Sequence, residues 1–233
     1  MAITHVATLT PTDNSGATTV SGSIDCTGTN TVLVAFVYEE TGDTVTGVDF
    51  NGVALTKVAT QHMCYSASAN TLTIWYLIAP ASGSHTLTAT RPGTSSFMVL
   101  TAQCVQGAAQ TGQPDASTTF ITGTVGSCGA GATSLSSSLT TIADNAWIIG
   151  SARFDNGGTV AGTGAFTKRA QGAAGNAAVH AIFDTNGTIT PPASTTIGAN
   201  GANAGSAWVF GAISIKPAGA TTATGATMLL MSV

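Results

Sequence analysis

Charged residues are scarce in this chain. Six of its 233 residues are Lys or Arg and ten are Asp or Glu, so charged residues make up 7%, against about 25% in an average soluble domain. Nucleic-acid binding depends on clustered Lys and Arg residues at the phosphates. With so few basic residues, we expect no nucleic-acid partner. Because weakly charged surfaces tend to associate, we expect a subunit covered by neighbours. An uncharged Thr/Ser surface on an extracellular β-protein is the alternative.

Long apolar segments and helical periodicity are also missing. No stretch approaches the ~20 consecutive apolar residues that a membrane-spanning helix needs, so we expect no membrane span. No long stretch has apolar residues at the spacing of a helix. Residues Met1–His5 include no basic segment followed by an apolar one, so we expect no secretory signal. The missing signal favours a virion part assembled in an infected cell over a protein whose signal was removed or that is exported by another route.

Cysteine and histidine do not form metal-binding patterns. The chain has four of each, with no C-x-x-C pair and no H-x-H or H-E-x-x-H motif, so a zinc site is not predicted. The cysteines would allow two disulfides in an oxidising setting, with three connectivities. We favour buried free thiols instead. The four are Cys26, Cys64, Cys104 and Cys128.

Catalytic motifs are missing as well. No serine lies in a G-x-S-x-G elbow, and no nucleophile and base have an identifiable orienting group. The Gly-rich segment 198–205 lacks the strand–loop–helix setting of a phosphate-binding loop. No two carboxylates stand out as a glycosidase pair. We therefore predict that the chain is not an enzyme and needs no cofactor, with calcium as the one candidate.

The calcium candidate rests on acidic residues that follow two matching apolar runs. Glu40 and Asp43 follow Thr31–Tyr38, and Asp155 follows the related segment 147–154. If the two loops lie close together, these three carboxylates could hold Ca²⁺ through oxygen atoms. The spacing is not that of an EF-hand, and Asp/Asn/Gly-rich turns are ordinary in β-hairpins. Plain turns are therefore the competing interpretation.

Strand signals run through the whole chain. Thr31–Tyr38, Thr71–Ile78 and Ser96–Val105 are continuous apolar runs rich in β-branched residues, as in central strands covered on both faces. His85–Arg91 alternates between apolar and polar residues instead. Asn51-Gly52 is a preferred two-residue hairpin turn. The sequence predicts an all-β fold, a jelly-roll-like antiparallel β-sandwich.

The two halves of the chain resemble each other in sequence. Matching segments keep the same order, and their spacing drifts only in turn regions, where insertions cost least. Halves of about 1–108 and 117–218 could form two small sandwiches or one larger one. Because the apolar runs need cover on both faces, we favour a single sandwich over 1–218. The matched pairs are 19–24 with 134–139, 32–34 with 147–149, 54–57 with 165–168, 70–78 with 176–184, and 98–100 with 208–210.

Residues 219–233 form a C-terminal arm with an apolar end. Such an end on a flexible arm would be poorly soluble if left in water. We therefore expect it to dock on a neighbouring subunit or a particle surface, as an added strand. Folding back onto its own sandwich is the alternative. The residues assigned to assembly are Met228, Leu229, Leu230, Met231 and Val233.

Several segments resemble the jelly-roll-like β-sandwich modules of phage virion and tail proteins and of bacterial surface proteins. The resemblance spans about residues 18–218 and implies display, decoration or adhesion, with no catalytic residue to transfer. We therefore expect a structural subunit of a virion or extracellular assembly, with copies of itself or other particle proteins as partners. A carbohydrate-binding or adhesin module for a surface glycan is the alternative. The segments are NTVLVAFVY, VTGVDFNGVALTKV, TLTIWYLIAPASGSHTLTAT, GQPDAS, DNAWIIGSARF and SAWVFGAISIKPA.

Overall fold

The protein is built from β-strands. The computed structural model describes residues 1–40, 45–66, 69–94, 97–122, 133–155, 158–173, 178–201 and 208–219. Every sheet in this part pairs its strands antiparallel, and its regular elements include no helix. The predicted all-β fold is confirmed. No helix long and apolar enough to cross a bilayer occurs among these residues.

The first half of the chain forms two sheets. The first inner sheet has the order β1-β9-β3-β7-β6, and the first outer sheet has the order β2-β8-β4-β5. The chain crosses repeatedly between the two sheets, which is the path of a jelly roll. The strands are β1 (Thr4–Ser15), β2 (Thr19–Asp25), β3 (Val32–Glu39), β4 (Gly47–Phe50), β5 (Val53–Ala54), β6 (Thr56–Ser66), β7 (Ala69–Ile78), β8 (Ser84–Thr90) and β9 (Phe97–Gln106).

The second half repeats this arrangement. Its inner sheet has the order β10-β17-β12-β15-β14, and its outer sheet has the order β11-β16-β13. Strand for strand, the order is that of the first half, with β13 in the place of β4 and β5. The sequence relation between the halves stays a prediction. The strands are β10 (Ala116–Thr122), β11 (Ser134–Thr140), β12 (Trp147–Phe154), β13 (Val160–Gly164), β14 (Thr167–Ala173), β15 (Val179–Asp184), β16 (Ser194–Gly201) and β17 (Trp208–Ile215).

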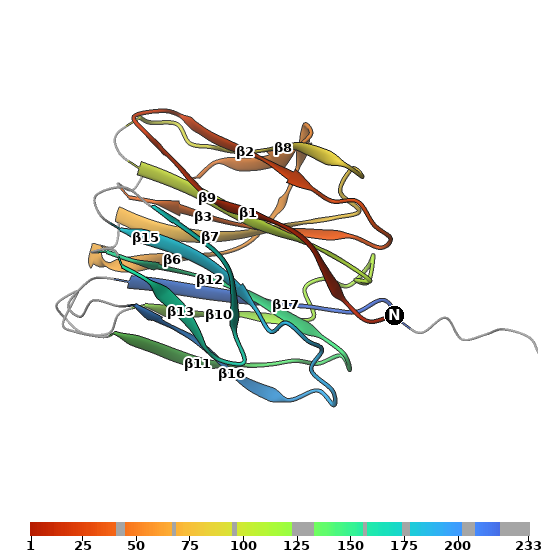
Figure 1. Cartoon of the computed structure of the whole chain (residues 1–233). Coiled ribbons are helices and arrows are strands. Elements are labelled where there is room, and N and C mark those ends of the chain that lie inside the picture. Colours follow the sequence, from red (N-terminus) through yellow and green to blue (C-terminus); the bar gives the residue numbers. More distant parts are fainter. Residues whose placement is uncertain are drawn as a thin grey trace, which may run out of the picture.

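The four sheets stack as layers, with the two inner sheets face to face in the middle (Figure 1). Three apolar clusters fill the spaces between the layers. One lies inside each jelly roll, and the third draws on both halves and lies between the inner sheets. A single sandwich over 1–218 is therefore not what the described residues form. They form two jelly rolls that share a third core.

This layering explains the continuous apolar runs. Along β3, Val34 and Phe36 belong to the cluster between the halves, whereas Leu33 and Val37 belong to the core of the first jelly roll. Every residue of β3, β12 and β17 is buried. The predicted cover on both faces is confirmed. One face of each of these strands is covered by the outer sheet of its own jelly roll, and the other face is covered by the other jelly roll. Sequence reasoning had placed both faces inside one merged core.

The halves pack with approximate twofold symmetry. Strand β1 contacts β14, and the corresponding pair, β6 and β10, is also in contact. The β1–β14 contact brings the two backbones close, since a Cβ at Gly172 would lie 2.5 Å from the carbonyl oxygen of Pro11. Each half therefore contacts the other through corresponding strands, as the two subunits of an isologous dimer do, although both halves belong to one chain.

One disulfide joins the residue directly after β2 to β9. Cys26 and Cys104 are both fully buried inside the first jelly roll, and their Cα atoms lie 5.6 Å apart, within the usual range for a disulfide. The predicted free thiols are wrong for this pair, because sequence spacing does not reveal that the two strands meet across the sandwich. The side chain of Cys64 and residue Cys128 lie outside the described residues.

Loss of this disulfide should destabilise the protein. The bond links residues 78 apart in sequence, and cross-links of this span restrict the unfolded chain enough to contribute about 2–4 kcal/mol. We expect the Cys26→Ala/Cys104→Ala variant to unfold at correspondingly lower urea concentration. Adding reductant should shift the wild type and leave this double variant unchanged. Equal midpoints for the oxidised wild type and the variant would contradict the expectation.

Candidate functional site

The acidic residues predicted from the two matching loops meet at an arginine. Arg153, near the end of β12, is 1% exposed. Its Nη2 lies 3.8 Å from Oε1 of Glu40, which follows β3, and its Nη1 contacts Oδ1 of Asp155. The two loops of the two halves therefore lie together, as expected. The third predicted calcium residue, Asp43, lies outside the described residues.

The guanidinium changes how these carboxylates can be interpreted. A cation already sits between Glu40 and Asp155, so part of their charge is neutralised without a metal. Within the described part of the chain, no three His, Cys, Asp or Glu side chains are grouped to hold a metal ion. Burial raises the pKa of Asp155, and the charge of Arg153 opposes that rise. Calcium binding stays a prediction.

Arg153 also stacks on a tyrosine from the other jelly roll. Its Cζ lies 3.9 Å from the ring centroid of Tyr38, at the end of β3. Such a cation–π contact is worth about 2 kcal/mol or more when it is shielded from water, and both residues are buried. Burial raises the pKa of Tyr38 above its ordinary value, so the phenol stays neutral. The pair joins the two inner sheets at this end.

A second ionic contact closes the end of the first jelly roll. Arg91, directly after β8, donates from Nη1 to Oε1 of Glu39 at 3.0 Å, and both side chains are 0% exposed. The Nε of Arg91 also donates to the carbonyl of Ala17 at 3.1 Å. These charges bind each other and the backbone inside the fold, so they serve its cohesion.

A third polar cluster links the halves around Asp184. This carboxylate, at the end of β15, accepts from the Gln103 amide of β9 and from Nε of Arg169, the latter at 2.7 Å. The backbone N–H of Asn186 donates to its other oxygen at 2.8 Å. Asp184 and Gln103 are both 0% exposed. The cluster fixes one jelly roll to the other through charge-assisted hydrogen bonds.

The side chains of Ser151 and His180 form a buried pair that resembles a nucleophile and its base. Ser151 Oγ contacts Nε2 of His180, and both residues are 0% exposed. The His180 Nδ1 has no hydrogen-bond partner among the described residues, whereas a catalytic histidine needs a group that orients it. A substrate could not reach this pair in the folded state. Its place in the core fits packing better than catalysis.

His180 should make stability depend on pH. Burial, followed by the nearby charge of Arg153, lowers its pKa from 6.5 to about 3. Below pH 6.5 the unfolded chain takes up a proton that the folded chain refuses until about pH 3, so stability falls as pH falls through this window. We expect a loss of about 1.6 kcal/mol between pH 6.5 and pH 5, because the slope approaches about 1.4 kcal/mol per pH unit only once the unfolded histidine is fully protonated.

The matched variant for this test is His180→Gln, which does not titrate. Urea unfolding at a series of pH values should show a smaller loss for the variant than for the wild type. Burial also lowers the pKa of His5, but that contribution is common to both proteins. Parallel stability curves would show that His180 is not the titrating group.

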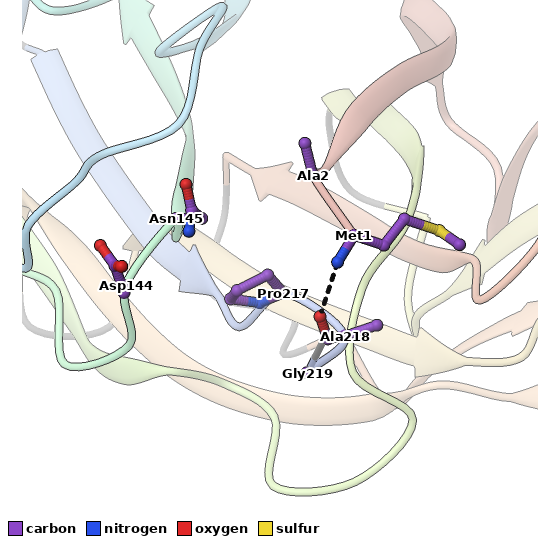
Figure 2. A pocket seen from close by; sticks show the side chains of 7 residues that line it. All are labelled: Met1, Ala2, Asp144, Asn145, Pro217, Ala218 and Gly219. Atoms are coloured by element: carbon purple, nitrogen blue, oxygen red, sulfur yellow. Dashed lines mark hydrogen bonds between the residues drawn. The ribbon is translucent and has the colours of Figure 1, made fainter. Parts of the chain in front are cut away.

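A pocket of about 410 Å³ lies at the opposite end of β12 from Arg153. Figure 2 shows that it lies where the chain's first residues meet the segment after β17, and that the Met1 amino group donates to the carbonyl of Ala218, at 3.2 Å. Its one ionisable side chain is Asp144, which is hydrogen-bonded to the hydroxyl of Thr190. Beside this engaged carboxylate the lining offers the Met1 amino group, which is itself hydrogen-bonded, and the Asn145 side chain, and this set does not define a reaction.

A carbohydrate-binding site usually stacks sugars on exposed aromatic side chains. Trp75, Trp147 and Trp208 are at most 7% exposed, so they pack in the core. They offer no stacking platform for a sugar. The side chain of Tyr65 lies outside the described residues, as do the assembly residues Met228, Leu229, Leu230, Met231 and Val233.

Comparison with protein-family models, with curated proteins and with solved structures finds no significant match to this chain.

Proposed function

We propose that the chain is a structural subunit of a viral particle or extracellular assembly, acting through its packed jelly rolls and their contacts with neighbouring subunits. The observation that carries the proposal is where the reactive side chains lie. Arg91, Arg153, His180 and Asp184 are each at most 1% exposed, and their described contacts hold the layers together. These four buried side chains thus serve the cohesion of the fold.

The outer faces support the same proposal. On the first outer sheet, Ser21 and Thr88 are hydrogen-bonded through their hydroxyls at 3.0 Å, and Ser23 and Ser84 at 2.8 Å. Rows of short, uncharged hydroxyl side chains carry little charge repulsion and little side-chain entropy. Such faces suit close contact with a neighbouring subunit. The apolar segment Met228–Val233 is proposed to add a docking contact of its own.

The native assembly state of the full chain tests this proposal. Sedimentation velocity over a range of concentrations, with electron microscopy of the same samples, should show oligomers or regular particles well above the 23.0 kDa of one chain. A monomer at every concentration that binds one glycan on an array would support the carbohydrate-binding alternative instead. The three buried tryptophans make that outcome the less expected one.

The C-terminal arm has a separate test. Deletion of residues 227–233 should lower the mass of the assembly, measured by light scattering, if this segment docks on a neighbour. A matched variant, Leu229→Ser/Leu230→Ser, keeps the length of the arm and removes only apolar surface, so it should act in the same direction. Unchanged mass in both variants would show that the arm makes no contact between subunits.

A further inference from the structure

The eight edges of the four sheets formed by the described residues differ in how well they are guarded against pairing with another chain. Edge strands in soluble proteins are usually blocked by bulges, charges or extreme shortness. All four inner-sheet edges carry irregular registers, for example between Lys57 and Ala59 on β6 and between Lys168 and Ala170 on β14. The other two irregular edges are β1, between His5 and Ala7 and between Leu9 and Thr12, and β10, between Ala116 and Thr119.

Two of the four outer-sheet edges are also guarded. Strand β5 has only two residues, too few to template a partner. Strand β13 is capped by a side chain, because Gln171 accepts from the N–H of Val160 at 2.9 Å and donates to the carbonyl of Gly158 at 2.8 Å. The edges that remain are β2 in the first outer sheet and β11 in the second.

Within the described part of the chain, strands β2 and β11 carry no bulge, no basic residue and no proline. Each has seven residues in an unbroken register with its neighbour, β8 or β16. Their sequences, TVSGSID and SLSSSLT, contain no Lys, Arg or Pro, and their burial patterns are identical. A regular, uncharged edge is the kind that accepts an added strand.

The flanking hydrogen bonds show which backbone groups point outward. Arg91 donates to the carbonyl of Thr18, and Cys26 donates to that of Gly83, so the even-numbered residues of β2 exchange hydrogen bonds with β8. Thr19, Ser21 and Ser23 therefore direct their N–H and C=O groups away from the sheet. Among the described side chains, the Asn14 amide meets this row once, at the carbonyl of Thr19.

The same reasoning applies to β11. Thr141 donates to the carbonyl of Ala193, and Gly201 donates to that of Thr133, so the odd-numbered residues of β11 pair with β16. Ser134 and Ser136 therefore direct their backbone groups outward. The two edges occupy corresponding places in the two jelly rolls.

We propose that β2 and β11 are the assembly edges of this protein, and that each pairs with an edge strand of a second copy of the chain. A second copy of the chain is the expected partner because β2 and β11 have the same length and the same burial pattern. Every copy therefore offers a strand that matches either edge. Asp25 is the one charged residue on either strand, so copies meet without strong repulsion. This inference rests on the proposed function and names the surface through which it acts.

The placement of the two edges allows continued growth. Strand β2 lies in the uppermost layer of Figure 1 and β11 in the lowest. Strand β2 contacts β1, and β11 contacts β10. Because β1 packs on β14 and β10 packs on β6, β1 and β10 lie on opposite sides of the stack. The two outer edges therefore lie at diagonally opposite corners. Each subunit can therefore pair with two neighbours at once, giving closed rings or extended chains.

Proline at the outward positions tests the proposal. Ser21→Pro/Ser136→Pro removes one outward N–H from each edge and no backbone hydrogen bond of either sheet, because edge strands tolerate proline where the N–H faces solvent. The matched control, Ser21→Ala/Ser136→Ala, loses the same hydroxyls and keeps both N–H groups. We expect the proline variant to sediment as a single chain of 23.0 kDa and the alanine variant to match the wild type.

A second variant keeps the proposal testable if the proline variant does not fold. Ser21→Lys/Ser136→Lys leaves the backbone unchanged and places a charge on each edge, so it should also give single chains with an unchanged circular dichroism spectrum. If the wild type assembles and both double variants assemble equally well, the edge proposal is overturned and the proposed function stands. If the wild type is itself a monomer at every concentration, both fail.

Discussion

Replacing Arg91 with alanine is expected to lower the free energy of unfolding by about 3–5 kcal/mol, the usual cost of breaking a buried ion pair from one side. The variant would leave the carboxylate of Glu39 in the interior without the guanidinium that lies 3.0 Å away. It would also remove the donor to the carbonyl of Ala17. Urea unfolding at neutral pH, followed by tryptophan fluorescence, measures the loss.

The second jelly roll supplies the control for this experiment. Gly201 corresponds to Arg91, because its N–H donates to Thr133 as that of Arg91 donates to Thr18. A Cβ at Gly201 would lie 2.9 Å from Cδ1 of Phe154, so this half closes the same place with a phenyl ring over a glycine.

The double variant Glu39→Phe/Arg91→Gly copies that apolar solution into the first half. Replacing a buried ion pair by apolar packing is often close to neutral, so the double variant should recover most of the stability lost by Arg91→Ala. If the double variant is no more stable than Arg91→Ala, a phenyl ring over a glycine cannot replace the ion pair at this place, and the expectation is wrong. If Arg91→Ala costs under 1 kcal/mol, the pair is not buried as described.

Phe36→Ala should have an effect of similar size, about 3–5 kcal/mol, because a large buried aromatic leaves a cavity when it is truncated. Phe36 is 0% exposed and belongs to the cluster between the two inner sheets. Residues of both halves build that cluster, so the loss should weaken the attachment of one jelly roll to the other. The midpoint of urea unfolding reports the change.

The control for Phe36→Ala is Val53→Ala, at a side chain that is 51% exposed on the short strand β5. Surface substitutions of this kind change stability by less than about 0.5 kcal/mol. A Phe36→Ala variant as stable as the Val53→Ala variant would mean that the inner sheets do not pack tightly against each other.

The sequence predicts the inner strands well because burial on both faces leaves a simple pattern. A run such as Val32–Val37, apolar at every position, fits a strand with no wet face. The alternation in His85–Arg91 likewise fits β8, where Leu87 and Ala89 are buried and their neighbours are more exposed. Side-chain burial follows from local patterns, so these strands could be found without knowing the fold.

The number of sandwiches could not be predicted in the same way. The apolar runs require a second cover, but one merged core and two stacked jelly rolls both provide it. The choice depends on which strands pair, and the orders β1-β9-β3-β7-β6 and β10-β17-β12-β15-β14 join strands that are far apart in sequence. Matching segments in the two halves pointed to repetition without showing that each half closes on itself.

The polar contacts were the hardest to foresee. The loops after β3 and β12 were expected to lie together, and Glu40 and Asp155 do meet, but at Arg153. Arg153, Arg91 and Asp184 gave no sequence signal, because a charged residue inside an apolar strand looks the same whether it is buried or exposed. Only the pairing of Tyr38 with Arg153 and of Gln103 with Asp184 across the halves reveals their roles.

Hydrogen exchange of the backbone amides tests most directly whether the two jelly rolls form one block. If the shared core binds the halves together, amides of β3 and β9 in one half and of β12 and β17 in the other should exchange only through global unfolding, with equal free energies. Amides of one half that exchange at a clearly lower free energy, while the other half stays protected, would contradict a four-layer block and show two independent domains.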